Sequence, residues 1–193
     1  AKAEAGYSTG TVTQMVAAGR PDTLPWKESF ADGMLGHQMA AHPLDGTAGG
    51  WQTFGDQSFS MGVKSYDSDN GMLGMYGPAV GDAARIFTGR IDMTNLEHPA
   101  LTFYTFNLQN SDGILDQNEL TVLADEYDGQ GFKKIKTLVI NEVAGGVRGW
   151  TKAVVDLSSC AGKTVSLAFD AVTKSYLYTI IDVLEIKDRK DSD

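Results

Sequence analysis

The sequence has a single cysteine, Cys160, so no disulfide can form within the chain and no thiolate metal cluster can be assembled. We expect Cys160 to be a small buried residue rather than a reactive thiol. The three histidines of the chain are scattered and lack the H-E-x-x-H pattern of zinc enzymes. No Asn-x-Ser/Thr acceptor occurs, an absence that favours a bacterial source.

Long apolar runs and an excess of basic residues are also missing. No stretch approaches the roughly 20 apolar residues that a membrane-spanning helix needs. The chain has 25 acidic against 16 basic residues and a formal net charge of -9, which repels phosphate backbones and anionic lipid head groups. These features exclude nucleic acid and membrane insertion, whereas 42% hydrophobic residues suffice for a folded core.

Helical periodicity is absent as well, since no window of a dozen residues carries an apolar helical stripe between capping residues. Alternating apolar and polar residues dominate, and 22 glycines supply turn positions. The pattern predicts an all-β fold, a two-sheet antiparallel jelly-roll sandwich of the concanavalin or galactose-binding type, with long connections.

The clearest hairpin joins residues 119–125 to residues 132–140, with Asp128-Gly129 and Gly131 in the turn. Its inward side chains are expected to be Leu120, Val122 and Ala124. Two other segments are informative: residues 163–172 predict a strand with one face in water, and residues 100–108 carry bulk on both faces, as a central strand does. Weaker strands are expected near residues 51–54, 72–76, 84–91, 150–157 and 175–187.

The first residues differ from the rest. A strand at 11–17 is followed by a connector containing Pro21 and Pro25, which suits a semi-rigid linker. Residues 1–23 resemble the last hairpin of a fibronectin type III domain plus a linker. We therefore expect a boundary there, a binding domain over residues 24–193, and a chain that is a segment of a larger protein, because it begins at Ala1.

From residue 24 onward the chain resembles the adhesin-type jelly rolls of Bacteroidetes surface proteins: the cleaved-adhesin, choice-of-anchor J and MAM-like domains. The resemblance is carried by the opening Leu24–Gly33, by Trp51 and the segments 65–71, 99–104 and 149–164, and by the closing strand 181–186. The paired Asp-Gly loop usual in adhesin members is altered here at residues 44–47. Such domains bind glycans, proteins or haem-related ligands, or space other domains, and the resemblance implies an extracellular or cell-surface location.

Three segments match parts of catalytic, phosphate-binding or calcium-binding motifs, but the residues around them do not fit those motifs. The Gly6–Gly10 segment matches a nucleophile elbow, but a β-branched strand follows it where a helix is required. At Gly162–Thr164 the phosphate-loop pattern lacks its earlier glycine, since Leu157 stands in that position. The Asp67–Gly71 segment lacks the later acids of an EF-hand, although a looser ion site stays open. We expect no catalytic residues.

A metal site is indicated by two acids placed with apolar neighbours. Alternation puts Asp182 on the face of Leu184 in the last strand, and Glu28 between Trp26 and Phe30 in the first. Jelly rolls bring first and last strands together, and two buried carboxylates would repel unless a cation lay between them. The sequence predicts a structural Ca²⁺ bound by Glu28 and Asp182, with Asp56 as a third ligand. In the alternative, Glu28 faces water and Asp182 accepts backbone amides at a bulge.

Ligand recognition would use aromatic faces, on which sugar rings stack, and acids or amides that take the hydroxyls. The aromatic candidates are Trp51, Tyr66, Tyr76, Tyr127 and Trp150. Tyr66 and Tyr76 are favoured by their Gly- and Asp-rich surroundings. Together with Trp51, Asp67 and Asp69 they form the predicted ligand site.

The sequence thus favours a non-catalytic binding or adhesion module of a larger secreted or cell-surface bacterial protein, with a glycan or protein ligand on a host or cell surface and neighbouring domains of the same chain as partners. The alternative is a structural spacer domain, or an accessory domain of a secreted hydrolase. Fold-level likeness does not choose between them.

Overall fold

The computed structural model describes residues 20–44, 48–59, 62–108 and 112–189. Its helical elements in those ranges are short: α2 (Ile140–Val143), η1 (Ala31–Gly33) and η2 (Ser158–Cys160). None of them has the length and apolar character to cross a bilayer. The strands are β1 (Trp26–Glu28), β2 (Ala40–Pro43), β3 (Gly50–Phe54), β4 (Met72–Tyr76), β5 (Ala83–Phe87), β6 (Ile91–Asp92), β7 (Pro99–Asn107), β8 (Glu119–Asp125), β9 (Lys133–Val139), β10 (Gly149–Asp156), β11 (Thr164–Val172) and β12 (Tyr178–Asp188).

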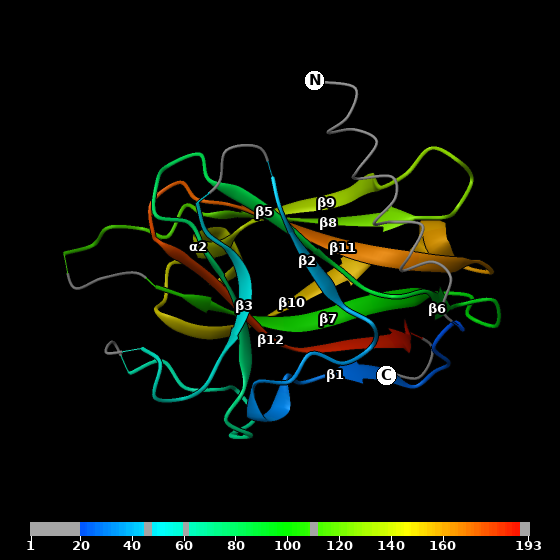
Figure 1. The fold of residues 1–193 in the computed structure, drawn as a ribbon, viewed down its shortest axis with the longest axis horizontal. Coiled ribbons are helices and arrows are strands. Elements are labelled where there is room, and N and C mark those ends of the chain that lie inside the picture. The colour runs from blue at the N-terminus through cyan, green and yellow to red at the C-terminus, as the bar shows by residue number, and fades with distance from the viewer. Residues whose placement is uncertain (1–19, 45–47, 60–61, 109–111, 190–193) are drawn as a thin grey trace.

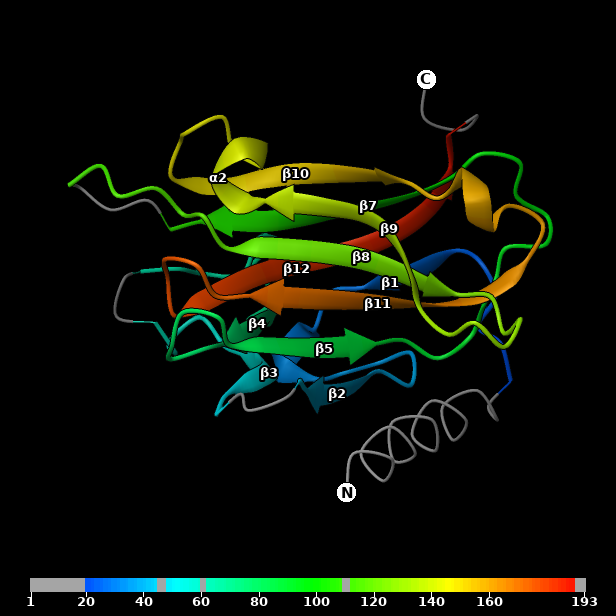
Figure 2. The same cartoon turned by 90° about the horizontal axis from the view of Figure 1, so that it is seen from above.

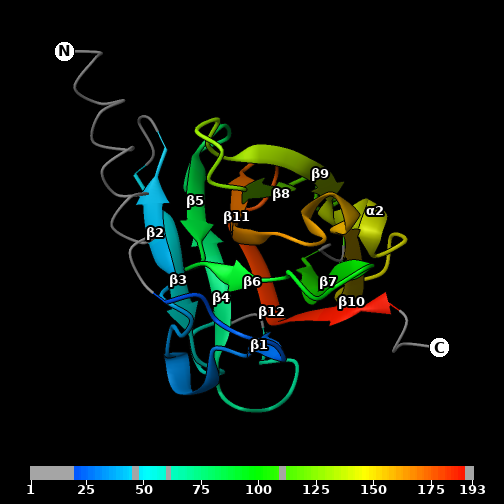
Figure 3. The same ribbon diagram turned by 90° about the vertical axis from the view of Figure 1, so that its right-hand side faces the viewer.

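The strands form two antiparallel sheets packed face to face (Figures 1 and 3). Sheet I has the order β10-β7-β12-β4-β3, with β1 also paired to β12. Sheet II has the order β2-β5-β11-β8-β9, with β6 also paired to β11. The predicted all-β sandwich is confirmed.

The β8–β9 hairpin forms where the turn residues predict it. Leu120 pairs with Leu138, and both Gly129 (φ +84°) and Gly131 (φ +69°) adopt the left-handed conformation that glycine tolerates without strain. Leu120, Val122 and Ala124 are buried in the main core. The alternation of the sequence therefore placed this hairpin correctly.

The core lies between the sheets and is built from the inner faces of the long strands. On β11 the inner residues are Val165, Leu167, Phe169 and Ala171, as predicted, and Phe169 meets Phe103 of β7 edge-on at 6.1 Å between ring centroids. β7 is a central strand between β10 and β12, which explains why it carries bulk on both faces.

The outer face of β11 differs from the expectation of a wet face. Ser166 and Ala168 are buried, because the Tyr127 hydroxyl hydrogen-bonds with the Ser166 hydroxyl and Phe132 from the β8–β9 turn packs in one cluster with Ala168. Asp170, further along the same face, forms a bidentate pair with Arg85 at 2.7 and 2.8 Å. Since the Arg85 guanidinium also lies 5.1 Å from the centre of the Phe132 ring, an aromatic and ionic layer covers this face.

Strand β12 is bordered on one side by two different strands in succession (Figure 2). β4 pairs with its first part, Tyr178 to Ile181, and β1 pairs with its later part, Leu184 to Ile186. The first and last strands are therefore neighbours, as the jelly-roll expectation required. Between the two pairings lies a junction at Asp182 and Val183.

The segment before β1 is attached to the sandwich. Asp22 forms a bridge with Ile91, in which its N–H donates to the Arg90 carbonyl at 2.8 Å and its carbonyl accepts the Asp92 N–H at 2.9 Å. Asp22 also accepts a hydrogen bond from His37 Nδ1 at 2.8 Å. The fibronectin-like hairpin predicted within residues 1–23 lies for its greater part outside the described residues.

Candidate functional site

The outer face of sheet I is covered at one end by the loop between β3 and β4, residues 55–71, of which 60 and 61 are not described. Ile181 of β12 points into the main core, so its neighbour Ile180 points to the outer face. Phe59 and Val63 of the loop are buried in one cluster with Ile180. The loop is thus packed onto the sheet by an apolar cluster of its own.

A bulge in β12 sets the direction of Asp182. The pairing of β12 with β7 shifts register between Asp182 and Glu185, and Val183 has a φ of +48°. Ile181 before the bulge and Leu184 after it both point into the core. The sequence placed Asp182 on the same face as Leu184, which is wrong because the extra residue inverts the alternation. Asp182 points outward and is 0% exposed beneath the loop.

The carboxylate of Asp182 is held by backbone amides. Its Oδ2 accepts the N–H of Tyr66 at 2.7 Å, and its Oδ1 accepts the N–H of Val183 at 2.8 Å. Burial raises the pKa of Asp182 to about 7, against the effect of these two hydrogen bonds, and the negative charges of Asp67 and Asp69 act in the same direction as burial. The predicted alternative, an acid accepting amides at a bulge, describes this geometry.

Glu28 is buried on the neighbouring strand, opposite Leu184. Its Oε1 accepts the N–H of Phe30 and its Oε2 accepts the N–H of Gly36, both at 2.7 Å. A Cβ atom on Gly36 would lie 2.5 Å from Oε2, so the close approach depends on glycine. Glu28 therefore does not face water, and it fastens the turn after η1 to the end of β1.

Asp56 organises the loop from within. Its Oδ1 accepts both the N–H and the Oγ–H of Ser65, at 2.7 and 2.8 Å, and its own N–H donates to Oδ1 of Asn70 at 3.0 Å. Across the described ranges, no three acids, histidines or cysteines gather into a group that could hold a metal by side chains alone. The calcium site of Glu28, Asp56 and Asp182 stays a prediction.

Two further acids lie at the end of the loop. Asp69 Oδ1 accepts the N–H of Gly71 at 3.1 Å, and its carbonyl accepts the N–H of Asp32 at 3.2 Å. The pKa of Asp67 is raised by desolvation of its carboxyl group and by the charge and hydrogen bond of Asp69, while Lys27 opposes the shift. Asp67 is exposed and directly follows Tyr66.

Tyr66 is an exposed aromatic residue with a fixed orientation. Its ring stacks on Tyr104 of β7, with 3.4 Å between centroids and 15° between planes, and meets the edge of Trp150 at 6.2 Å. Trp150 Nε1 donates to the carbonyl of Lys64 at 2.9 Å, which ties the preceding residues of the loop to β10. Because Tyr66 is 42% exposed, it presents a flat ring to solvent beside Asp67.

The other predicted aromatic residues lie elsewhere. Trp51 is buried in the main core, and its Nε1 donates to the Ala84 carbonyl at 2.9 Å. Tyr76 is half-buried against Tyr178 at the start of β12. Tyr127 lies in the β8–β9 turn on sheet II. The structure therefore brings Tyr66, Asp67 and Asp69 together, and it does not add Trp51 or Tyr76 to them.

Sequence reasoning missed Tyr104 and Lys152, which lie directly opposite each other on β7 and β10. Phe103 of β7 points into the main core, so its neighbour Tyr104 lies on the outer face. No local pattern indicated that a loop some forty positions earlier would lay an aromatic ring on it. Nothing in the sequence around Lys152 distinguishes it from any other exposed lysine in a strand.

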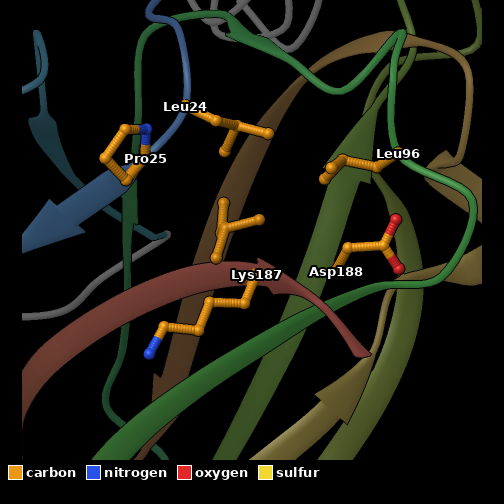
Figure 4. Close-up of a pocket in the computed structure, with 6 residues that line it drawn as sticks. Leu24, Pro25, Leu96, Lys187 and Asp188 are labelled. Carbon is orange, nitrogen blue, oxygen red and sulfur yellow. The ribbon is translucent and has the colours of Figure 1, made fainter. Parts of the chain in front are cut away.

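A pocket of about 380 Å³ lies at the far end of β12 (Figure 4). Leu24 and Leu96 point toward one another across it. Its two charged side chains already have partners: the Asp188 carboxylate accepts the N–H groups of Glu97 and His98, and Lys187 pairs with Glu185 at 3.1 Å. The pocket is mainly apolar and unsuited to a hydroxyl-rich ligand.

No protein-family model matches the chain, and no curated protein sequence matches it. Among solved structures it is similar to the K1 cleaved adhesin domain of Lys-gingipain from Porphyromonas gingivalis W83, with 22% identity, a TM-score of 0.62, and coverage of 84% of this chain and 97% of that one. The K3 cleaved adhesin domain of the same protein gives 17% identity, a TM-score of 0.59, and coverage of 84% and 98%.

A third similar structure was described in a study of the promiscuous specificity of carbohydrate-binding modules from the β-sandwich superfamily. It shares 11% identity and a TM-score of 0.52, over 89% of this chain and 64% of that one. At such identities the likeness establishes architecture and not ligand. The chain has the fold of an adhesin-type β-sandwich domain.

Proposed function

We propose that this chain is a non-catalytic binding module of a larger secreted or cell-surface bacterial protein, and that it binds a glycan on the exposed ring of Tyr66. The observation that carries the proposal is the fixed orientation of that ring. Tyr104 stacks beneath it, and Asp182 holds its backbone amide. A ring that is immobilised before binding loses little conformational entropy when a sugar stacks on it.

The surroundings of Tyr66 suit sugar hydroxyls. Asp67 is exposed next to the ring and supplies carboxylate oxygens as hydrogen-bond acceptors, and Asp69 lies two positions further along the same loop. An aromatic face flanked by a few polar groups is the usual composition of a small-ligand site. The similar structures include adhesin and carbohydrate-binding domains, which supports a binding role and an extracellular location.

The test is a glycan array probed with the wild type, Tyr66→Ala and Tyr76→Ala. Removing the stacking ring should lower affinity about tenfold or more, as loss of an aromatic anchor does. Tyr76→Ala removes the same side chain away from the site and should bind as the wild type does. An array that stays empty, or equal binding by all three proteins, would overturn the glycan proposal.

A protein ligand is the second candidate, and a group of exposed apolar side chains favours it. Ile114, Val147 and Leu177 are exposed in loops at one end of the sandwich, and the Tyr176 hydroxyl donates to the Ile114 carbonyl at 2.9 Å, joining two of these loops. Exposed apolar groups of this kind mark protein contacts when they are contiguous. A pull-down that fails alongside an empty glycan array would favour the spacer alternative.

We also propose that a structural Ca²⁺ binds at the β12 junction, with Glu28 and Asp182 as ligands and Asp56 as a third. Both acids are buried near this junction, which supports the proposal, but Asp182 points to the outer face of sheet I and Glu28 lies opposite the inward-pointing Leu184. Each carboxylate oxygen can accept from a second direction besides its amide N–H. Because the described residues gather no group of three such side chains, backbone carbonyls and water would complete the six to eight oxygens that Ca²⁺ takes.

A further inference from the structure

Beside Tyr66, part of the outer face of sheet I is left uncovered. Lys152 on β10 lies directly opposite Tyr104, and the next outward pair in the register is Val154 with Thr102. Both Lys152 and Val154 are exposed. Because Tyr66 stacks on Tyr104, Lys152 lies next to the part of the Tyr66 ring that rests on the sheet. Asp67 follows Tyr66 within the loop.

The acids on this part of the face have cations of their own. Glu185 pairs with Lys187 at 3.1 Å, and Asp156 pairs with Arg189 at 2.6 Å. Among the residues that the structure describes, Lys152 has no carboxylate within ion-pair distance. A hydrogen bond with Tyr104 raises the pKa of the Tyr66 phenol, and the positive charge of Lys152 opposes this shift. The ammonium charge therefore acts on the same ring on which a ligand would stack.

The protein as a whole is acidic, with a formal net charge of -9. The overall field repels anions, and a polyanion would meet many acids. A ligand with a single carboxylate next to its stacking ring would meet one lysine at short range, where screening by salt is least. The charge arrangement thus favours a sugar with one carboxylate over a neutral or a multiply charged one.

We propose that the glycan carries a carboxylated sugar, such as a uronic or sialic acid, that stacks on Tyr66 with its carboxylate directed to Lys152 Nζ and its hydroxyls directed to Asp67. This inference rests on the proposed glycan-binding function and names the class of sugar. Lys152 is then a specificity-determining residue, because it distinguishes an acidic sugar from a neutral one of similar shape.

The experiment uses two matched pairs of probes in titration calorimetry: a glucuronic-acid oligosaccharide with its carboxyl-reduced form, and sialyllactose with lactose. The wild type should bind the acidic member of one pair about two- to fivefold more tightly in low salt. The preference should fall to about one in Lys152→Met and persist in Lys152→Arg. In Lys136→Met, which removes an exposed lysine of β9 on sheet II, it should also persist.

The pair that shows the preference identifies the acidic sugar. The difference should shrink in about 0.5 M salt, because the ion pair is solvent-exposed. This inference is overturned by equal affinity for both members of each pair, or by a preference that survives Lys152→Met. The proposed function then stays intact if Tyr66→Ala still weakens binding. Binding to neither pair and to no glycan of the array overturns the proposed function, and this inference with it.

Discussion

The N–H of Tyr66 donates to the carboxylate of Asp182 at 2.7 Å and joins positions 116 residues apart in the sequence. The contact links the exposed ring to the junction in β12, where neither β4 nor β1 pairs with the strand. At this junction the Asp182 carboxylate accepts a backbone N–H of the loop, in the place where a paired strand would supply a carbonyl oxygen. The position of the candidate ligand site therefore depends on a buried acid that is itself out of reach of solvent.

Asp182→Ala should lower the free energy of unfolding by about 2 to 4 kcal/mol, because the amides of Tyr66 and Val183 lose their acceptor in a buried environment. Urea unfolding at neutral pH measures the change, and hydrogen exchange should show faster exchange at the Tyr66 amide. Asp92→Ala, which removes an exposed carboxylate bonded to Thr94, is the control and should cost about 1 kcal/mol or less. Equal losses in the two variants would argue against a special role for Asp182.

Gly71→Ala should be among the more damaging glycine substitutions. A Cβ atom at this position would lie 1.8 Å from the backbone carbonyl oxygen of Phe30, where the loop end passes the exit of β1. Neither backbone segment can move without disturbing its pairing, so we expect a loss of about 3 kcal/mol or more. Gly50→Ala meets no atom within 4 Å and should be near neutral in the same thermal melts.

Asp116 should make stability depend on pH. It is fully buried, and burial raises its pKa to about 6, although the N–H groups of Asn118 and Leu108 oppose the shift. Since the folded pKa exceeds the unfolded one, Asp116 contributes stability that is present below about pH 4 and is lost as the pH rises through about 6. The sign is that of a group that holds its proton more tightly when folded.

Urea unfolding of the wild type and of Asp116→Asn at pH 4.5 and 7.5 measures this contribution. The stability of the wild type relative to the variant should fall by on the order of 2 kcal/mol between the two pH values. Asp92→Asn should show almost no change over this range, because hydrogen bonds from Thr94 lower the pKa of Asp92 and its contribution is lost only below about pH 4. A difference between wild type and Asp116→Asn that is flat with pH would show that Asp116 stays ionised in the fold.

Removal of calcium should lower the melting temperature if the proposed ion binds Glu28 and Asp182, because an ion that binds only the folded state adds stability with the logarithm of its free concentration. Melts in millimolar calcium and in chelator, on the wild type and on Asp182→Asn, measure the effect. The variant should not respond to chelator, and the response of the wild type should shrink at acid pH as the ligands protonate. Identical melts of the wild type would leave Asp182 as an acid held by backbone amides alone.

Local alternation predicted the elements whose contacts are local. The hairpin of β8 and β9, the inner face of β11 and the central place of β7 all followed from residue patterns within each strand. Alternation failed at Asp182 because one bulged residue inverts the faces of a strand, and neither residue of the Asp182-Val183 pair signals a bulge by its type. It failed again on the outer face of β11, which Phe132 covers from a turn.

The candidate site was predicted only in part. Tyr66, Asp67 and Asp69 stood out because their loop is rich in glycine and acids, a local signal. Trp51 belonged to the same prediction and is a core residue, since an aromatic residue in a strand gives no sign of which side will be covered. The stacking of Tyr66 on Tyr104, and its nearness to Lys152, depend on how a long loop crosses a sheet.

Every residue except proline has a backbone N–H, so an acid that binds an amide places almost no demand on the side chain there. Asp182 anchors the loop at position 66 in this way. Substitutions in the loop that replace Tyr66 and Asp67 would therefore keep its attachment to β12 while changing what it presents to solvent. Related chains that preserve the acid in the last strand are free to diverge in the loop, and a single scaffold can acquire new specificities without redesign of its sheets.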